Sequence, residues 1–177
     1  GFTWTKSQDG YPWIGVSCQA NGSYLWYPSK EHPSDEPEGA DIHITVTKPL
    51  SVASNGVLQK VTDLKNKWHT WHWKTNYNIN PYNINFTVGN FEIVERIIPS
   101  LEKPLNTQFF VLGENREGAD KLLDHAEIYI DFFTRSFGQY PWLKEKLGIV
   151  NTPYLGMEHQ TIIAYGNDYK YNDKGYD

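Results

Sequence analysis

Between residues 116 and 137, apolar side chains recur with the period of an α-helix. They occupy positions i, i+3, i+4, i+7, i+11, i+14 and i+18 of one helical face, namely Ala119, Leu122, Leu123, Ala126, Ile130, Phe133 and Phe137. Asn115 is expected to cap the start of this helix, and Gly138 followed by Pro141 is expected to end it. A helix with one apolar stripe has to pack against a sheet or another helix.

The residues before position 100 show instead the two-residue period of β-strands. Ile42, Ile44 and Val46 alternate with polar residues, as in a strand that is buried on one face. Together with the segments that follow, this pattern predicts a β-meander or a β-sandwich. The further strands are expected at residues 57–61, 67–74, 86–88 and 91–98, with turns at 55–56 and 89–90, the second of these closing a hairpin.

Two more strands are expected near the start of the chain, at residues 13–20 and 24–28. Asn21 and Gly22 between them form a turn dipeptide, because both residue types accept positive φ angles. The pair would make a hairpin with Gln19 near its tip.

The sequence pattern changes between residues 99 and 107, where Pro104 interrupts the strand period. Beyond this point, strands are expected at 108–112, 147–150 and 155–165, with the helix between the first two. We therefore expect a fold that is mostly β and then α+β. The expected domains are residues 1–102 and residues 103–177.

Composition excludes several classes of function. The net charge is −5 and no long run of one sign occurs, so nucleic acid is not an expected partner. The single cysteine, Cys18, excludes an internal disulfide and a zinc site made of several thiolates. No stretch reaches the roughly 18 apolar residues of a membrane helix, so no membrane segment is expected. The first residues lack a signal-peptide pattern, and the sequence is compatible with an exported, periplasmic protein or a cytoplasmic one.

We expect no complete catalytic or metal site in this chain. A helical zinc peptidase site needs His-Glu-x-x-His, and none of the six histidines is paired at that spacing. His69 and His72 are three residues apart in an expected strand, so they would point to opposite faces. No Gly-x-Ser-x-Gly motif is present, and Cys18 is expected to be a small buried residue.

The aromatic content of 15% allows a different class of protein, a non-catalytic β-sandwich module that binds carbohydrate or peptide. Its best candidate platform is the run at residues 68–73, where Trp68 or Trp71 could stack on a sugar ring. Packing in the core of the sheet is the competing explanation for the same residues. The long helix and the strand after it have no place in a simple sandwich of this kind.

One acid, Glu158, stands in the apolar run at residues 154–165. Gly156, two residues earlier, allows a ligand or another backbone to come close. A carboxylate in such a run needs a partner.

The segment around Glu158 resembles the Gly-x-Met-Glu-Asn motif of zinc aminopeptidases of the aminopeptidase N type, the gluzincin aminopeptidases that include the leukotriene hydrolases. Met157 and Glu158 match the motif, whereas Leu155 replaces its first Gly and His159 replaces its Asn. Four other segments are similar to family segments in the same order. They are 17–22, similar to the segment with the family's other substrate-binding side chain; 26–28 with 35–37, similar to its Pro-rich loop; 53–56, similar to its Ser-Asn-Gly turn; and 137–142, similar to its Phe-Gly-x-Tyr-Pro segment.

The resemblance implies a saddle-like β domain, present in part, followed by the opening of a thermolysin-like catalytic domain. It implies that Glu158 binds the free α-amino group of a peptide and that Gln19 contacts the first substrate residue. The backbone of Gly156 and Met157 would line the cleft and help to hold the scissile carbonyl. These roles are physically reasonable, because a carboxylate accepts charge-assisted hydrogen bonds from an ammonium group and an edge strand can bind an extended peptide.

In the family, the His-Glu-x-x-His helix, a third zinc-binding Glu and a Tyr that stabilises the transition state all follow this motif, and the sequence given ends at Asp177. We therefore expect an internal fragment of a longer enzyme. The resemblance implies Zn²⁺ as the cofactor of the intact enzyme and none in this chain, which alone would be inactive. The implied partners are peptide N-termini and the remainder of the catalytic domain.

Overall fold

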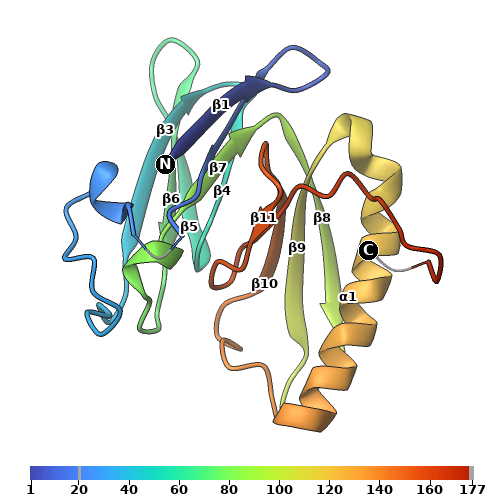
Figure 1. The fold of residues 1–177 in the computed structure, drawn as a ribbon. Helices are drawn as coiled ribbons and strands as arrows, with labels where there is room; N and C mark the ends of the chain where they lie inside the picture. The colour runs from blue at the N-terminus through green and yellow to red at the C-terminus, as the bar shows by residue number, and fades with distance from the viewer. Residues whose placement is uncertain (20, 176–177) are drawn as a thin grey trace.

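The computed structural model describes residues 1–19 and 21–175. Over these residues the chain is mostly β, with three sheets, one α-helix and three short 3₁₀ helices (Figure 1), which confirms the expectation of a mostly-β fold. The strands are β1 (Phe2–Lys6), β2 (Pro12–Val16), β3 (Asp41–Thr47), β4 (Ser51–Ser54), β5 (Val57–Asp63), β6 (Trp68–Lys74), β7 (Phe86–Gly89), β8 (Phe91–Ile98), β9 (Leu105–Leu112), β10 (Leu147–Asn151), β11 (Gly156–Met157) and β12 (Ile163–Tyr165). The helices are η1 (Ser23–Leu25), η2 (Pro81–Asn83), η3 (Gly113–Asn115) and α1 (Arg116–Phe137).

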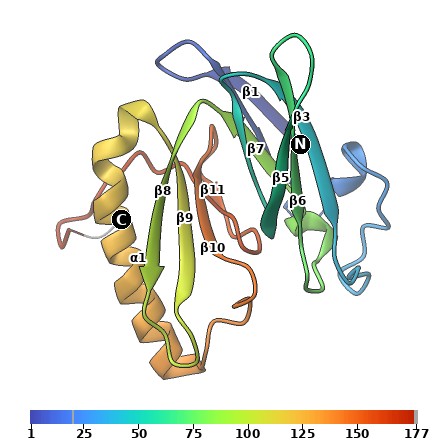
Figure 2. The same cartoon turned by 180° about the vertical axis from the view of Figure 1, so that it is seen from behind.

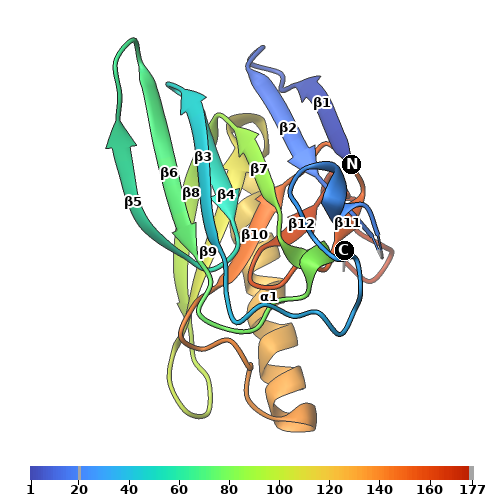
Figure 3. The ribbon, with the colours of Figure 1, turned by 90° about the vertical axis from the view of Figure 1, so that its left-hand side faces the viewer.

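The first two sheets contain the strands predicted between residues 41 and 90, whereas the strand predicted at residues 91–98 is β8 of the third sheet. One has the order β1-β2-β7-β4 and the other has the order β3-β6-β5, whose strands lie side by side in Figure 3. Ile42 and Val46 of β3 are buried while Asp41 and His43 are exposed, as the alternation requires. Their core also takes side chains from β9 and β10, because Phe110 and Val150 belong to the same buried cluster.

The aromatic run in β6 serves this core. Trp71 and Trp73 are buried, and the indole nitrogen of Trp73 donates a hydrogen bond to the carbonyl of Val52 at 3.1 Å. Trp68 is 45% exposed. His69 is buried and His72 lies on the other face, as predicted for residues three apart in a strand. Of the two candidate stacking residues, Trp71 is therefore enclosed and only Trp68 faces solvent.

Two predicted hairpins are wrong. Residues 24–28 form no strand, because residues 23–25 belong to η1, and β2 pairs instead with β1 before it. The carboxylate of Glu31 accepts hydrogen bonds from the backbone N–H groups of Gly22 and Tyr24, which removes those donors from a strand ladder. The other wrong hairpin is β7 with β8, since β7 pairs with β2 and β4, whereas β8 pairs with β9.

The third sheet has the order β11-β12-β10-β9-β8, and its inner strands β9 and β10 are mostly buried. α1 lies along the face away from the other two sheets (Figures 1 and 2). In β9, Phe109 and Val111 pack with α1, whereas Phe110 packs with the other sheets. Two-sided burial explains why this strand is apolar without alternation. Because β8 precedes residue 102 and β9 follows it, this sheet crosses the predicted domain boundary. The division into two domains at this residue stays a prediction.

α1 has the predicted bounds, and Gly138 ends it with a φ of 98°. Asn115 stands at its start without a side-chain cap; its side chain donates instead to the amide oxygen of Asn151 at 3.4 Å. The apolar stripe is buried only over its first half. Ala119 and Leu123 are fully buried, whereas Phe137 is 80% exposed.

The single strand predicted at residues 155–165 is also wrong. The segment folds back on itself, and β11 pairs antiparallel with β12, Gly156 opposite Tyr165 and Met157 opposite Ala164. Residues 158–162 form the connecting loop. Glu158 therefore lies at the end of a short strand and not inside a long one.

Candidate functional site

β11 is the edge strand of the five-stranded sheet. In the described part of the chain its pairing partner is β12, so the backbone groups along its other side have no strand beside them. Gly156 is exposed. Gly166, the first residue after β12, packs tightly against the segment before β11, since a Cβ at residue 166 would lie 1.7 Å from the carbonyl oxygen of Tyr154. Glycine at residue 166 is therefore required for the close approach of the two backbones.

Glu158 is the first residue after β11 and its side chain is exposed. The hydroxyl of Tyr82, from η2, donates a hydrogen bond to Glu158 Oε1 at 3.3 Å. Burial, and then the charge of Glu158, raises the pKa of Tyr82, so this hydroxyl stays protonated and remains a donor. The sequence predicts that the carboxylate has a partner; the structure supplies one from the β-rich half of the chain.

The loop after Glu158 is held by polar side chains from elsewhere in the fold. Asn83 Oδ1 accepts a hydrogen bond from the backbone N–H of Gln160 at 2.9 Å. Asn55 Nδ2 donates to the carbonyl of Gln160 at 2.6 Å and to that of Asn83 at 3.0 Å. The backbone N–H of Gly56 donates to Thr161 Oγ1 at 2.9 Å. The turn at residues 55–56, predicted from the Asn-Gly pair, thus fixes the loop that carries the carboxylate.

His159 stands beside Glu158 in sequence but is buried. Neither of its ring nitrogens has a hydrogen-bond partner among the described residues. Burial lowers the pKa of His159 to about 4, so the ring is neutral at neutral pH. It therefore places no positive charge next to the carboxylate.

The segment before β11 docks on β2. Tyr154 donates its hydroxyl hydrogen to the carbonyl of Val16 at 3.0 Å, and Trp13 Nε1 donates to the carbonyl of Asn151 at 3.1 Å. Gln19 follows β2 with an exposed side chain. The contacts between described residues do not join Gln19 to Glu158, so the part assigned to Gln19 stays a prediction.

A buried lysine near this loop was not foreseen from the sequence. Lys146 Nζ donates to the carbonyl oxygens of Ser54 at 2.8 Å and Gly56 at 2.6 Å, and it lies 4.6 Å from the ring centre of Trp73. Burial lowers the pKa of Lys146 to about 7, against the opposing effect of the Glu145 carboxylate. The run Lys144-Glu145-Lys146 has the composition of a solvated turn, so no signal in it marks the buried lysine.

Together these residues form an exposed carboxylate at the end of an unpaired strand edge. Such an arrangement can accept hydrogen bonds from an ammonium group and can pair with an extended backbone. A group of three side chains close enough to bind a metal, among the described residues, consists of Asp41, His43 and His72 on β3 and β6, and it does not include Glu158. Over the same residues, no helix is long and apolar enough to cross a lipid bilayer.

No family model matches this sequence, and no curated protein matches it significantly. The solved structures that match its fold include two of a variant of a two-domain M1 zinc metallopeptidase, one bound to L-arginine and the other to L-tryptophan. Each has a TM-score of 0.75, with sequence identities of 15% and 16%, and the alignment covers 97% of this chain but 39% of theirs. The resemblance to zinc aminopeptidases is thus supported at the level of the fold.

Proposed function

We propose that this chain is part of a zinc-dependent aminopeptidase and that it supplies the site for the free amino terminus of the peptide substrate. The observation that carries this proposal is the exposed Glu158 carboxylate at the end of edge strand β11. The similarity of the fold to zinc metallopeptidases supports it.

Glu158 would bind the substrate's α-ammonium group. One carboxylate oxygen, Oε1, accepts the hydrogen bond from Tyr82, and each carboxylate oxygen can accept more than one. The ammonium group has three N–H donors, and hydrogen bonds between two charged groups are stronger than those between neutral ones. The Tyr82 hydroxyl restrains the rotation of the carboxylate, so the amine would be held at one place.

The free side of β11 would bind the substrate backbone as an added strand. Gly156 is exposed and carries no side chain, so an extended peptide can approach its backbone closely. With the amine fixed at Glu158, the register of the peptide is set, and the first peptide bond always occupies the same place. Met157 would line this cleft, and Gln19 would contact the first side chain of the substrate.

On this proposal the catalytic zinc would be bound by a His-Glu-x-x-His motif, which the sequence given does not contain. On this proposal, the chain alone has no peptidase activity.

The exposed half of α1 supports the idea that further polypeptide covers this chain. Phe133 and Phe137 are 52% and 80% exposed, and Ile163 on β12 is 40% exposed. They line a hollow of about 680 Å³ together with Ile130 and Tyr140. Apolar surface of this kind on one side of a sheet is typical of an interface. We infer that the remainder of a thermolysin-like catalytic domain packs there.

The reading frame that encodes this chain provides a first test. The proposal predicts a His-Glu-x-x-His motif within a few tens of residues downstream of residue 177. A frame that continues without this motif would refute the assignment to a zinc aminopeptidase.

Kinetics of the longer enzyme provide the second test. Glu158→Gln keeps the shape of the side chain and removes its charge. A hydrogen bond to a charged group contributes about 1.5–3 kcal/mol, so kcat/KM for an aminoacyl anilide should fall roughly 10- to 100-fold. Glu36→Gln, at an exposed carboxylate in the loop before β3, is the matched control and should leave kcat/KM unchanged. Equal rates for wild type and Glu158→Gln would contradict the amine-binding role.

A further inference from the structure

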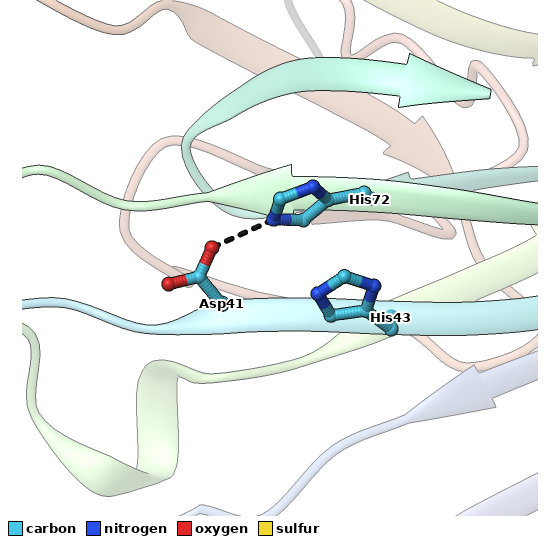
Figure 4. A group of neighbouring side chains, drawn as sticks. All are labelled: Asp41, His43 and His72. Atoms are coloured by element: carbon cyan, nitrogen blue, oxygen red, sulfur yellow. Dashed lines mark hydrogen bonds and ion pairs between the residues drawn. The ribbon is translucent and has the colours of Figure 1, made fainter. Parts of the chain in front are cut away.

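Three side chains with metal-binding groups lie together on neighbouring strands of the three-stranded sheet. Asp41 and His43 are two residues apart on β3, and His72 on β6 is directly opposite His43. Ile42 and Trp73 beside them are buried, so the alternation of the strands sends the three groups to the solvent face. Figure 4 shows the three side chains gathered between the two strands.

Their spacing is close to that of a metal site. His72 Nε2 lies 2.6 Å from Asp41 Oδ1, and the rings of His43 and His72 stack with centroids 4.0 Å apart and planes 16° apart. One ligand atom from each residue lies within 4.8 Å of the others. A tetrahedral zinc ion with bonds of about 2.0–2.1 Å separates its ligand atoms by roughly 3.4 Å. Asp41 and His43 are exposed and His72 is half-buried, so the side chains would have to rotate to reach that geometry.

We propose that Asp41, His43 and His72 form a binding site for a divalent transition-metal ion of the Zn²⁺ class. Two imidazoles and one carboxylate are a donor set that zinc, copper and nickel accept. Binding uses the lone pairs of the imidazole nitrogens, so the hydrogen bond between His72 and Asp41 is replaced by two bonds to the ion. Because the site is open to solvent, water completes the coordination.

The backbone of the site is fixed without the metal. β3 and β6 pair in register from Asp41 and Lys74 to Thr47 and Trp68, and their inward side chains belong to the buried core. One neighbouring charge opposes binding: Lys74 Nζ lies 3.9 Å from Asp41 Oδ2 and competes with a cation for this carboxylate. Lys74→Gln should therefore tighten metal binding several-fold.

This inference is independent of the proposed peptidase function, because the catalytic zinc of that proposal would be bound elsewhere. The ion here would be an additional one, on the solvent face of the β3-β6-β5 sheet.

Calorimetric titration of the metal-free protein with Zn²⁺ tests the site. We expect His43→Gln and His72→Gln each to lose one equivalent of bound zinc relative to wild type. His32→Gln is the matched control, since His32 is exposed in the loop before β3, and it should keep that equivalent. The proposal is wrong if wild type and all three variants bind the same amount of zinc. It is also wrong if wild type binds no zinc.

A second measurement removes any ambiguity from a variant that fails to fold. In the wild-type protein, Zn²⁺ should shift the imidazole resonances of His43 and His72 in a nitrogen-correlated NMR spectrum and leave that of His32 in place. Zinc that shifts other histidines, or none, would overturn the proposal without the need for any substitution.

Discussion

Replacing Asn55 by alanine tests whether the turn after β4 holds the loop that carries Glu158. Asn55 is fully buried. Its Nδ2 donates to the carbonyl oxygens of Asn83 at 3.0 Å and Gln160 at 2.6 Å, and its Oδ1 accepts from the backbone N–H of Asn85 at 2.9 Å. One side chain thus satisfies backbone groups of three separate positions.

The magnitude follows from the three groups that Asn55→Ala leaves without their partner. Each hydrogen bond contributes about 1 kcal/mol net, and a buried group without a partner costs at least as much. The free energy of unfolding should therefore fall by about 3 kcal/mol. For a chain of this size, that corresponds to a Tm lower by roughly 6–12 °C.

Urea unfolding followed by tryptophan fluorescence measures this effect. Asn106→Ala is the matched control, because Asn106 is exposed on β9, and it should change the free energy of unfolding by less than about 0.5 kcal/mol. The backbone amide resonances of Gln160 and Thr161 should also shift in Asn55→Ala. If Asn55→Ala and Asn106→Ala have the same stability, the turn does not hold the loop as we describe.

Three further predictions concern buried charge, backbone geometry and metal. The pKa of Lys146 is about 7 in the folded protein against an ordinary value of 10.5, so the unfolded chain binds more protons between these pH values. Stability should therefore rise as the pH increases from 7 to 10. Urea unfolding at stepped pH should show this rise, and Lys146→Met should remove it. Gly56→Ala should lower Tm more than Gly10→Ala. Both residues have positive φ, but only at Gly56 would a Cβ meet a backbone atom, the Lys74 oxygen at 2.0 Å. Equal losses of Tm would refute the close approach. Zinc at about 100 times its Kd should add about 2.7 kcal/mol of stability and raise Tm by roughly 5–10 °C, and an unaltered Tm shift in His72→Gln would contradict the assigned ligands.

Local periodicity predicted much of the secondary structure. The bounds of α1 follow from the apolar stripe, and the strands β3, β5 and β6 follow from alternation and a turn at Asn55 and Gly56. These signals suffice for α1, β3 and β6 because the buried face of each is defined by its own residues. The exposure of Phe133 and Phe137 could not be predicted in the same way, since it depends on what packs against the helix.

Strand pairing was the part that local signals missed. The dipeptide Gly89-Asn90 has the composition of a hairpin turn, yet β7 and β8 join different sheets, because β7 pairs with the distant strands β2 and β4 and β8 pairs with β9, the next strand along the chain. The aromatic run at residues 24–28 has strand-like residues, but Glu31 binds the backbone donors of that segment. In both places a tertiary contact outweighs the local preference.

The candidate sites show the same difference between local sequence patterns and contacts made by distant residues. Glu158 stood out as one acid in an apolar run, whereas its neighbour Tyr82 is 76 residues away in sequence and no pattern joins the two. Alternation alone places Asp41, His43 and His72 on polar faces of their strands. Their proximity depends on the register between β3 and β6, which single-strand patterns do not determine.

Binding of paired ligands to the longer enzyme tests the central claim most directly. Calorimetry would compare L-leucinamide with its analogue that lacks the amino group, in wild type and in Glu158→Gln. The four binding free energies form a double-mutant cycle, which isolates the contact between the carboxylate and the ammonium group. We predict that Glu158→Gln weakens L-leucinamide roughly 10- to 100-fold and leaves the analogue unchanged. Equal weakening of both ligands, or of neither, would contradict the assignment of Glu158 as the anchor of the peptide amino terminus.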